Sequence, residues 1–400
     1  MKRLLLAGLM ATTALGAAAQ AAAAHASTAA HASTAAAKET CGPTYNSGTA
    51  LGSAPWPGTS VPWRSVGQGW ILGVVTAKQS GTGPQTLYLV SPAGRRYQVG
   101  TAPPGATLVD WSGRSMDALF VTQPVNGPKA TVYVLNLKTG QTNGFSVYSA
   151  GGDYISLSFT RPSGRGILVL ASATSTGGFL PVQRYSLTGT RQACYPNSFP
   201  GAGRGADGYA ESPSGAGLVL EMRNGGFEVL SNSGQPIRFL RPPHGFSSCG
   251  TLNWWSGTVV VASCGSTSQT TAELWAFPLS GARPTQISGK GQSAIFMGAW
   301  RLPSGTYARE AACGSSWLER LNSNGTGTQV LIPGAANAGN VQPLGTYGNR
   351  MPVLVTGGCD GHTPYSKVDW FSPATDKATT VLGASAGGGF VMNALLYPES

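Results

Sequence analysis

The sequence has 400 residues, of which only 10% are charged and 57 are glycine, and its formal net charge is +11. Helical surfaces are usually rich in Glu, Lys and Arg, so this composition argues against a helical protein and favours a turn-rich, all-β protein. The Lys and Arg residues are scattered, without a cluster or a helical stripe, which argues against nucleic acid as a partner. Solubility explains the positive charge, or else attraction to an anionic extracellular polymer does.

Residues 1–26 have the pattern of a secretory signal peptide. Lys2 and Arg3 precede an apolar run, and a small-residue cleavage site, Ala24-His25-Ala26, follows it. Small residues dilute this run well short of the ~20 strongly apolar residues that a membrane span needs, so we expect no span in the mature chain. Residues 27–60 are expected to form an Ala-, Ser- and Thr-rich leader and linker. The protein is therefore predicted to be secreted, either extracellular or associated with the cell envelope.

A glycine-containing turn recurs through residues 61–400. Two copies are nearly identical, namely "RPSGRGILVLA" around Gly164 and "ESPSGAGLVLE" around Gly215. Related turns recur at a mean spacing of about 47 residues, at Gly67, Gly113, Gly257, Gly305 and Gly348. Glycine takes a positive φ without a Cβ clash, so each turn is predicted to reverse the chain between two strands.

A second motif, a short apolar strand that runs into a polar turn, repeats in phase with the first. Its seven copies begin near residues 87, 131, 182, 227, 274, 317 and 368. Each unit therefore consists of a strand, a tight turn, a strand, a longer loop, a strand, a tight turn and a strand. A period near 45 residues with four strands per unit predicts that residues 61–400 form one domain, a seven-bladed β-propeller of four-stranded antiparallel blades.

The turns "RPSGRG" and "SPSGAG" resemble the SPDG turn of WD40-like and TolB-type β-propellers, with Ser in place of the usual Asp. The resemblance covers about residues 60–400 and implies a fold, because the turn carries geometry and no chemistry. Beyond the seventh unit, "GGFVMNALLYPES" predicts a C-terminal strand that closes the ring within the first blade. The segment "SVPWRS" is the competing candidate for the innermost strand of that blade.

Six cysteines, an even number in a chain predicted to be secreted, indicate disulfides rather than a metal site. Cys249 and Cys264 flank the turn of the fifth unit, which should place them opposite each other on adjacent strands. Cys313 and Cys359 occupy the same place as Cys264 in the next two units and could bridge neighbouring blades. Cys41 and Cys194 are then left as a third pair by elimination. Buried free thiols are the alternative for some of the six.

The loops between second and third strands, and the links between blades, are long and share one face of the predicted ring. Long loops on a rigid scaffold often carry function, so we expect a ligand to meet that face. The candidate ligand-binding residues on these loops are Arg204, Asp207, Arg241, His244, Asp360, His362, Tyr365 and Lys367. The last four lie close together on one loop, where they could form an acid/base pair or contact an anion. The alternative is a turn whose side chains are simply solvated.

The sequence contains no GxSxG, HExxH or EF-hand motif, and only His244 and His362 lie beyond the leader. We therefore expect no metal and no cofactor. The predicted function is a binding or scaffold module for an extracellular or cell-envelope protein or an anionic polymer, rather than an enzyme. The alternative is a propeller lyase or glycosidase acting on extracellular polysaccharide. Charged residues that converge on the mouth of the central channel would favour that alternative.

Overall fold

The chain divides into two units, residues 1–39 and 40–400, and all residues described below belong to the second. The structure is a computed structural model that describes residues 49–53, 60–78, 83–122, 129–148, 155–171, 179–195, 206–223, 225–265, 272–289, 295–312, 315–334, 339–357, 366–384 and 389–398. No helix within these ranges is long and apolar enough to cross a membrane.

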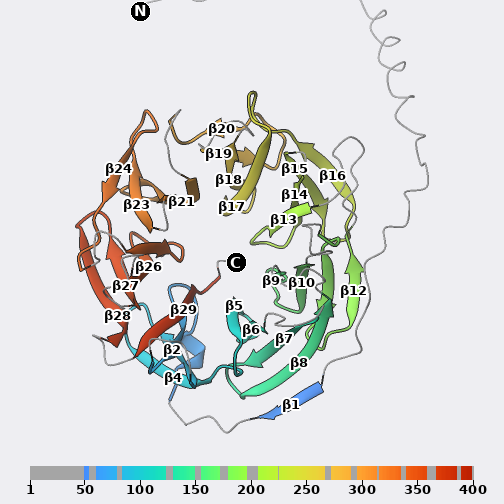
Figure 1. Cartoon of the computed structure of the whole chain (residues 1–400), viewed down its shortest axis with the longest axis vertical. Helices are drawn as coiled ribbons and strands as arrows, with labels where there is room; N and C mark the ends of the chain where they lie inside the picture. The colour runs from blue at the N-terminus through green and yellow to red at the C-terminus, as the bar shows by residue number, and fades with distance from the viewer. Residues whose placement is uncertain are drawn as a thin grey trace, which may run out of the picture. The chain divides into compact units, whose positions relative to one another are not determined.

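Strands β2 to β29 form seven antiparallel blades of four strands around a ring (Figure 1). From the centre outwards, the first blade contains β29 (Phe390–Leu396), β2 (Ile71–Thr76), β3 (Gln85–Val90) and β4 (Arg96–Thr101). The second contains β5 (Thr107–Ser112), β6 (Asp117–Thr122), β7 (Lys129–Asn136) and β8 (Gln141–Tyr148). The third contains β9 (Ile155–Phe159), β10 (Gly166–Ala171), β11 (Gln183–Ser186) and β12 (Arg191–Cys194).

The remaining four blades follow in chain order. The fourth contains β13 (Ala206–Glu211), β14 (Gly217–Met222), β15 (Phe227–Ser231) and β16 (Pro236–Leu240). The fifth contains β17 (Ser248–Ser256), β18 (Val259–Gly265), β19 (Ala272–Pro278) and β20 (Thr285–Gln286). The sixth contains β21 (Ile295–Leu302), β22 (Gly305–Ala312), β23 (Ser315–Leu321) and β24 (Gly327–Val330). The seventh contains β25 (Asn340–Pro343), β26 (Met351–Thr356), β27 (Ser366–Ser372) and β28 (Lys377–Gly383). One parallel pair, Ser316 of β23 with Asn340 of β25, connects the sixth blade to the seventh.

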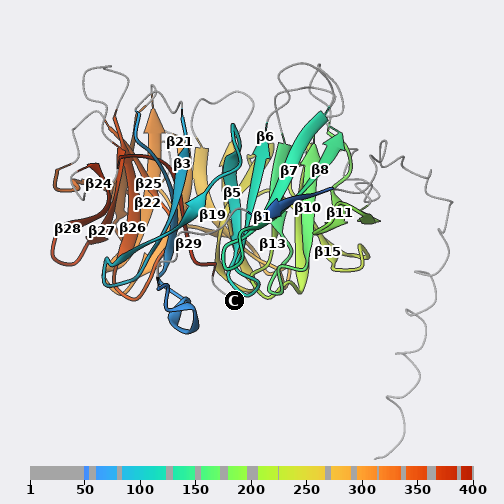
Figure 2. The ribbon, with the colours of Figure 1, turned by 90° about the horizontal axis from the view of Figure 1, so that it is seen from below.

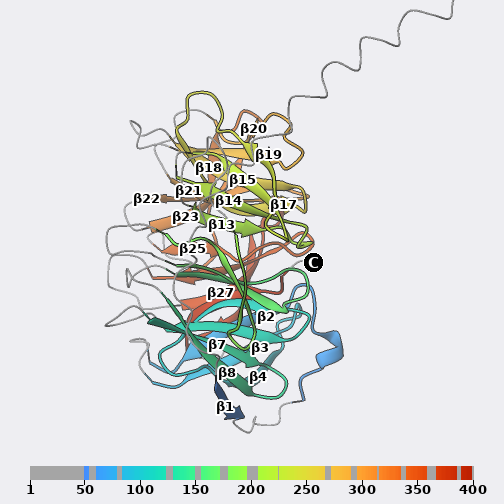
Figure 3. The ribbon, with the colours of Figure 1, turned by 90° about the vertical axis from the view of Figure 1, so that its right-hand side faces the viewer.

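Apolar second strands explain why the blades pack face to face. β2 reads Ile-Leu-Gly-Val-Val-Thr and is buried at every position, because the neighbouring blades cover both of its faces. The described residues form seven apolar clusters, one between each pair of neighbouring blades. One of them, around Ile71, Trp370 and Leu382, joins the seventh blade to the first. Figures 2 and 3 show the strands from the side, running between the two faces of the ring.

The repeated turns carry the expected backbone conformation in the two best copies. Gly164 and Gly215 have φ of 66° and 71°, and their amides donate to the carbonyls of Thr160 and Ser212. The prediction was wrong for Gly257 in the fifth unit, and for Gly67 and Gly113 in the first two units. There, Gly69 (φ 79°) and Met116 (φ 56°) take the positive φ instead.

Both ends of the described chain pair with early blades. β29 pairs antiparallel with β2, so the C-terminal strand is the innermost strand of the first blade. The competing segment does not form a strand, since Trp63–Ser65 is a short 3-10 helix, η1. β1 (Thr49–Ser53) pairs with β8 as a fifth strand on the outer edge of the second blade. The range 27–60, predicted to be leader and linker, thus includes one strand.

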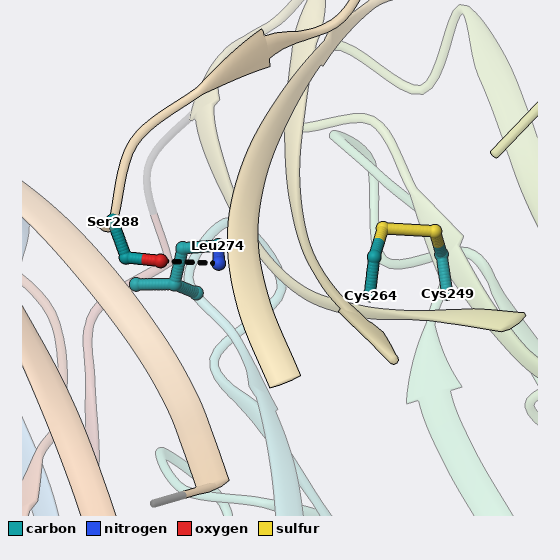
Figure 4. The surroundings of a disulfide bond; sticks show 4 residues. All are labelled: Cys249, Cys264, Leu274 and Ser288. Carbon is teal, nitrogen blue, oxygen red and sulfur yellow. Dashed lines mark hydrogen bonds between the residues drawn. A yellow bond between two sulfur atoms is a disulfide. The ribbon is translucent and has the colours of Figure 1, made fainter. Parts of the chain in front are cut away.

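The predicted disulfide between Cys249 and Cys264 is present in the fifth blade (Figure 4). The two residues pair directly across β17 and β18, with their Cα atoms 4.0 Å apart. Cys194 is also disulfide-bonded. The other three cysteines, Cys41, Cys313 and Cys359, lie outside the described residues. The pairings of these four cysteines stay predictions.

Candidate functional site at the mouth of the central channel

A cavity of about 400 Å³ is lined by residues at or near the ends of the innermost strands of the ring. Its walls come from six of the seven blades, the third to the seventh and the first. All innermost strands run towards the face that carries the short turns around Gly164 and Gly215, so the cavity opens on that face. The long loops, which were predicted to meet the ligand, lie largely outside the described residues.

Arg161, just beyond β9, connects three blades at this mouth. Its Nη2 lies 2.7 and 3.0 Å from the two carboxylate oxygens of Asp110 in β5. Its backbone amide donates to Oε2 of Glu211 in β13 at 2.7 Å. Asp110 also accepts the amide of Phe159 at 2.7 Å. Hydrogen bonds that involve a charged group are stronger than neutral ones, so these carboxylates hold the second, third and fourth blades together.

The carboxyl group of Glu211 is poised between its two protonation states. Burial raises the pKa of Glu211 to about 7, although the amide and the charge of Arg161 oppose the shift. Two residues earlier, Tyr209 places its hydroxyl 3.0 Å from Oγ of Ser158, and it donates to the carbonyl of Leu168 at 3.2 Å. Burial raises the pKa of Tyr209 as well, so the phenol stays neutral. At neutral pH, Glu211 can therefore donate or accept a proton.

Aromatic side chains form the other wall of the cavity. Trp254 in β17 and Trp300 in β21 are half-buried and line it, together with Tyr397. Tyr397 packs edge-on against Trp111, with the ring centroids 5.2 Å apart. Asn253 binds the backbone of Ala299 through its side-chain oxygen at 2.9 Å and its nitrogen at 2.6 Å, which fixes the fifth blade to the sixth. The cavity thus combines aromatic faces with a few fixed polar groups, as ligand sites usually do.

The residues predicted from the loops do not line this cavity. Arg241 and His244 are exposed and line a second cavity between the fourth and fifth blades. Lys367 pairs with the buried Asp369 of its own strand, with Nζ 2.7 Å from Oδ2, so its charge is neutralised. Four candidates, Arg204, Asp360, His362 and Tyr365, lie outside the described residues, as does the side chain of Asp207. Within the described part of the chain, no three His, Cys, Asp or Glu side chains gather in a way that could hold a metal ion.

The sequence analysis missed Asp110, Arg161, Tyr209 and Glu211. A signal for two of them was present, since Arg161 and Glu211 are the first residues of the two nearly identical turn stretches. Glu211 is the last residue of β13 and Arg161 lies two residues beyond the end of β9, so both lie where an innermost strand enters its turn, at the channel mouth.

No protein-family model and no curated protein matches the sequence. Among solved structures, the chain is similar to the β-propeller domain of the Trilobed protease from Pyrococcus furiosus, with a TM-score of 0.52 and 10% identity, over 78% of this chain and 92% of that one. The fold is a β-propeller. The propeller is also similar to a prolyl endopeptidase (TM-score 0.52, 14% identity, 81% of this chain and 52% of that one) and to oligopeptidase B from Leishmania major (0.50, 10%, 78% and 48%). It spans about half the length of these two peptidases, and at such identities the likeness shows the fold alone.

Proposed function

We propose that this protein is a secreted binding module that takes its ligand at the mouth of the central channel. The observation that supports this most strongly is the cavity of about 400 Å³, in which six blades combine aromatic and polar side chains. A rigid ring holds these groups in place before the ligand arrives, which lowers the entropy lost on binding. Secretion rests on the signal peptide expected at residues 1–26, and the disulfide of the fifth blade is compatible with an oxidising compartment.

The lining favours a neutral sugar at the end of a glycan chain. Trp254 and Trp300 present flat apolar surfaces on which a sugar ring can stack, and the neighbouring fourth blade supplies hydrogen-bonding groups from Tyr209 and Glu211. Arg161 is already paired with Asp110, so the mouth offers little attraction to an anion. Ligand cavities usually measure roughly 300–1,000 Å³, and this one lies near the lower limit, which suits one or two sugar units.

The test is a titration of the mature protein with neutral oligosaccharides released from isolated bacterial cell walls, followed by tryptophan fluorescence and calorimetry. Trp254→Ala and Trp300→Ala should each weaken binding about tenfold, because a lost aromatic contact costs roughly 1–1.5 kcal/mol. Trp63→Ala is the matched control, since Trp63 lies in η1, outside the channel lining. Melting curves of all three variants verify folding. Unchanged affinity in both channel variants would refute the proposed site.

A second candidate function is acid–base catalysis on extracellular polysaccharide, and Glu211 favours it. This carboxyl group has a pKa of about 7 and lies beside Tyr209 and Arg161 at the channel mouth, where a lyase or glycosidase would need charged groups. Against it, Asp110 and Glu211 both accept backbone amides of the neighbouring blade. Glu211→Gln distinguishes the two. Formation of reducing ends or unsaturated uronates by the wild type, abolished in this variant, would favour the enzyme. Binding without product would favour the module.

A further inference from the structure

A second cavity, of about 490 Å³, opens between the outer parts of the fourth and fifth blades, and we refer to it as the rim groove. It is lined by residues 239–244 at the end of β16 and beyond, by Trp275 and Phe277 of β19, and by the turn 281–284. The neighbouring blades can be followed in Figure 1 from β16 to β20. β20 is the shortest of the described strands and pairs only with Trp275 and Ala276. The outer edge of the fifth blade is therefore incomplete, and this leaves the groove open.

The rim groove is lined by positive charge without a carboxylate. Arg241, His244 and Arg283 belong to its lining and are exposed. Arg238 lies beside it, with its guanidinium in the space that a Cβ on Gly281 would occupy. The ion pairs found within the described ranges, Arg161 with Asp110 and Lys367 with Asp369, involve none of these side chains. The groove thus has two guanidinium groups and an imidazole in its lining and a third guanidinium beside it, and no acidic side chain belongs to the lining.

Trp275 adds a hydrogen-bond donor to this set. Its indole N–H is buried and has no acceptor among the described residues, and the same holds for Nε of Arg238. A buried donor without an acceptor destabilises the folded state and favours any nearby negative charge. Trp275 packs edge-on against Phe246, at 5.8 Å between ring centroids, so the ring is fixed in position. The charged side chains that line the groove are therefore donors without a carboxylate among them, which is complementary to an oxyanion.

We propose that the rim groove binds a segment of an anionic extracellular polymer, with Arg241 and Arg283 contacting its phosphate or carboxylate groups. Guanidinium groups match both oxyanions in a bidentate geometry. A groove on the side of the ring lets a long chain pass through, whereas the channel mouth suits a chain end. The excess of basic over acidic residues would add long-range attraction. This site shares no lining residue with the channel mouth and differs from it in charge and ligand, so either site can fail without the other.

The test measures binding of the mature protein to immobilised inorganic polyphosphate and to polygalacturonate, at low and at physiological salt. The double variant Arg241→Ala/Arg283→Ala should weaken binding at least tenfold and flatten the salt dependence. The control Arg96→Ala/Arg165→Ala removes the same charge from two exposed positions, one of them on β4 across the ring (Figure 1). It should retain near-wild-type binding. Tighter binding of polyphosphate would indicate a ligand with phosphate groups, and tighter binding of polygalacturonate would indicate a ligand with carboxylate groups.

Three outcomes would overturn the proposal. Equal losses in the two double variants would show that net charge alone attracts the polymer. Failure of the wild type to bind either polymer at low salt would exclude this ligand class. Binding of polyglutamate alone, sensitive to Arg241→Ala/Arg283→Ala, would replace the polymer with an acidic peptide. Titration with neutral oligosaccharides should be unaffected by the groove variants, and polymer binding should be unaffected by Trp300→Ala, so the two proposed sites are tested separately.

Discussion

Glu310 in β22 and Glu319 in β23 share one indole donor, since Nε1 of Trp317 lies 3.1 Å from Oε2 of the former and 3.1 Å from Oε1 of the latter. Because both carboxyl groups contact the same nitrogen atom, they lie close together, and a negative charge on one disfavours ionisation of the other. Burial and the neighbouring Glu319 raise the pKa of Glu310 to about 8. The sixth blade therefore retains a proton at neutral pH.

This proton makes stability depend on pH. The pKa of Glu310 is about 8 in the folded protein and about 4.5 in the unfolded chain. The unfolded state thus releases a proton that the folded state keeps, so the stabilisation is complete below about pH 4.5 and is lost as the pH rises to about 8. Glu310→Gln removes this titration, and its melting temperature should fall less than that of the wild type between pH 5 and pH 8.

Thermal melts across that pH range check this prediction. Asp376→Asn serves as the control, because Asp376 is exposed and its φ of 51° suits asparagine. The control should follow the wild-type curve. A Glu310→Gln variant with the same pH dependence as the wild type would show that the pair is ionised in the folded protein.

The contacts of Asp110 should contribute strongly to stability. Asp110→Ala would leave Arg161, whose side chain is 20% exposed, without its carboxylate, and would leave the amide of Phe159 without its acceptor. Loss of one partner of a largely buried ion pair costs about 3–5 kcal/mol. Urea denaturation should show a loss of that order, and a smaller loss in Asp110→Asn, which keeps an acceptor. Equal stability of Asp110→Ala and the wild type would contradict this role.

The disulfide of the fifth blade should stabilise the protein by restricting the unfolded chain. Cys249 and Cys264 are 15 residues apart, and closure of a loop of this length contributes about 3 kcal/mol. Cys249→Ser/Cys264→Ser should lower the free energy of unfolding by about this amount in guanidinium titrations. An unchanged midpoint would show that the hairpin of β17 and β18 already restricts the unfolded state.

Deletion of residues 388–400 should abolish cooperative folding. The deletion removes β29, and with it Val391 and Ala394, which are buried between the seventh and first blades. Ala394→Asp offers a milder test, because it places a charge at a fully buried position and should lower the melting temperature sharply. Unchanged melting of the truncated protein would show that β2 does not need its inner partner.

Local sequence patterns predicted the architecture because the strands and turns of a blade follow one another closely in the sequence. The motif "FEVLSNSG" is β15, and its counterparts are the third strands of the other six blades. The pairing of Cys249 with Cys264 followed from their distance to a common turn. The residue that takes the positive φ in each turn was less predictable. In the second blade it is Met116, which is only 5% exposed and packs in the core between the first two blades. Packing, rather than turn chemistry, decides that position.

The channel mouth could not be derived in the same way. Asp110, Arg161 and Glu211 belong to three blades, and their proximity depends on the order of the ring rather than on spacing within a unit. The protonation of Glu211 depends on burial, which no single stretch of sequence encodes. Loop composition drew attention to Arg241, His244 and Lys367 instead. Of these three, Lys367 is neutralised by Asp369 within its own strand.

The pairing of β2 with β29 has a consequence for the order of folding. Leu72 pairs with Leu89 on one side and with Leu395 on the other, so the first blade to be synthesised is the last to be completed. Contacts between residues so distant in sequence form slowly, because the chain entropy between them must be lost first. Until β29 arrives, the inner edge of β2 has no partner and can pair with other chains. We therefore expect completion of the ring to be a late event of folding, and the incomplete ring to be prone to misassembly.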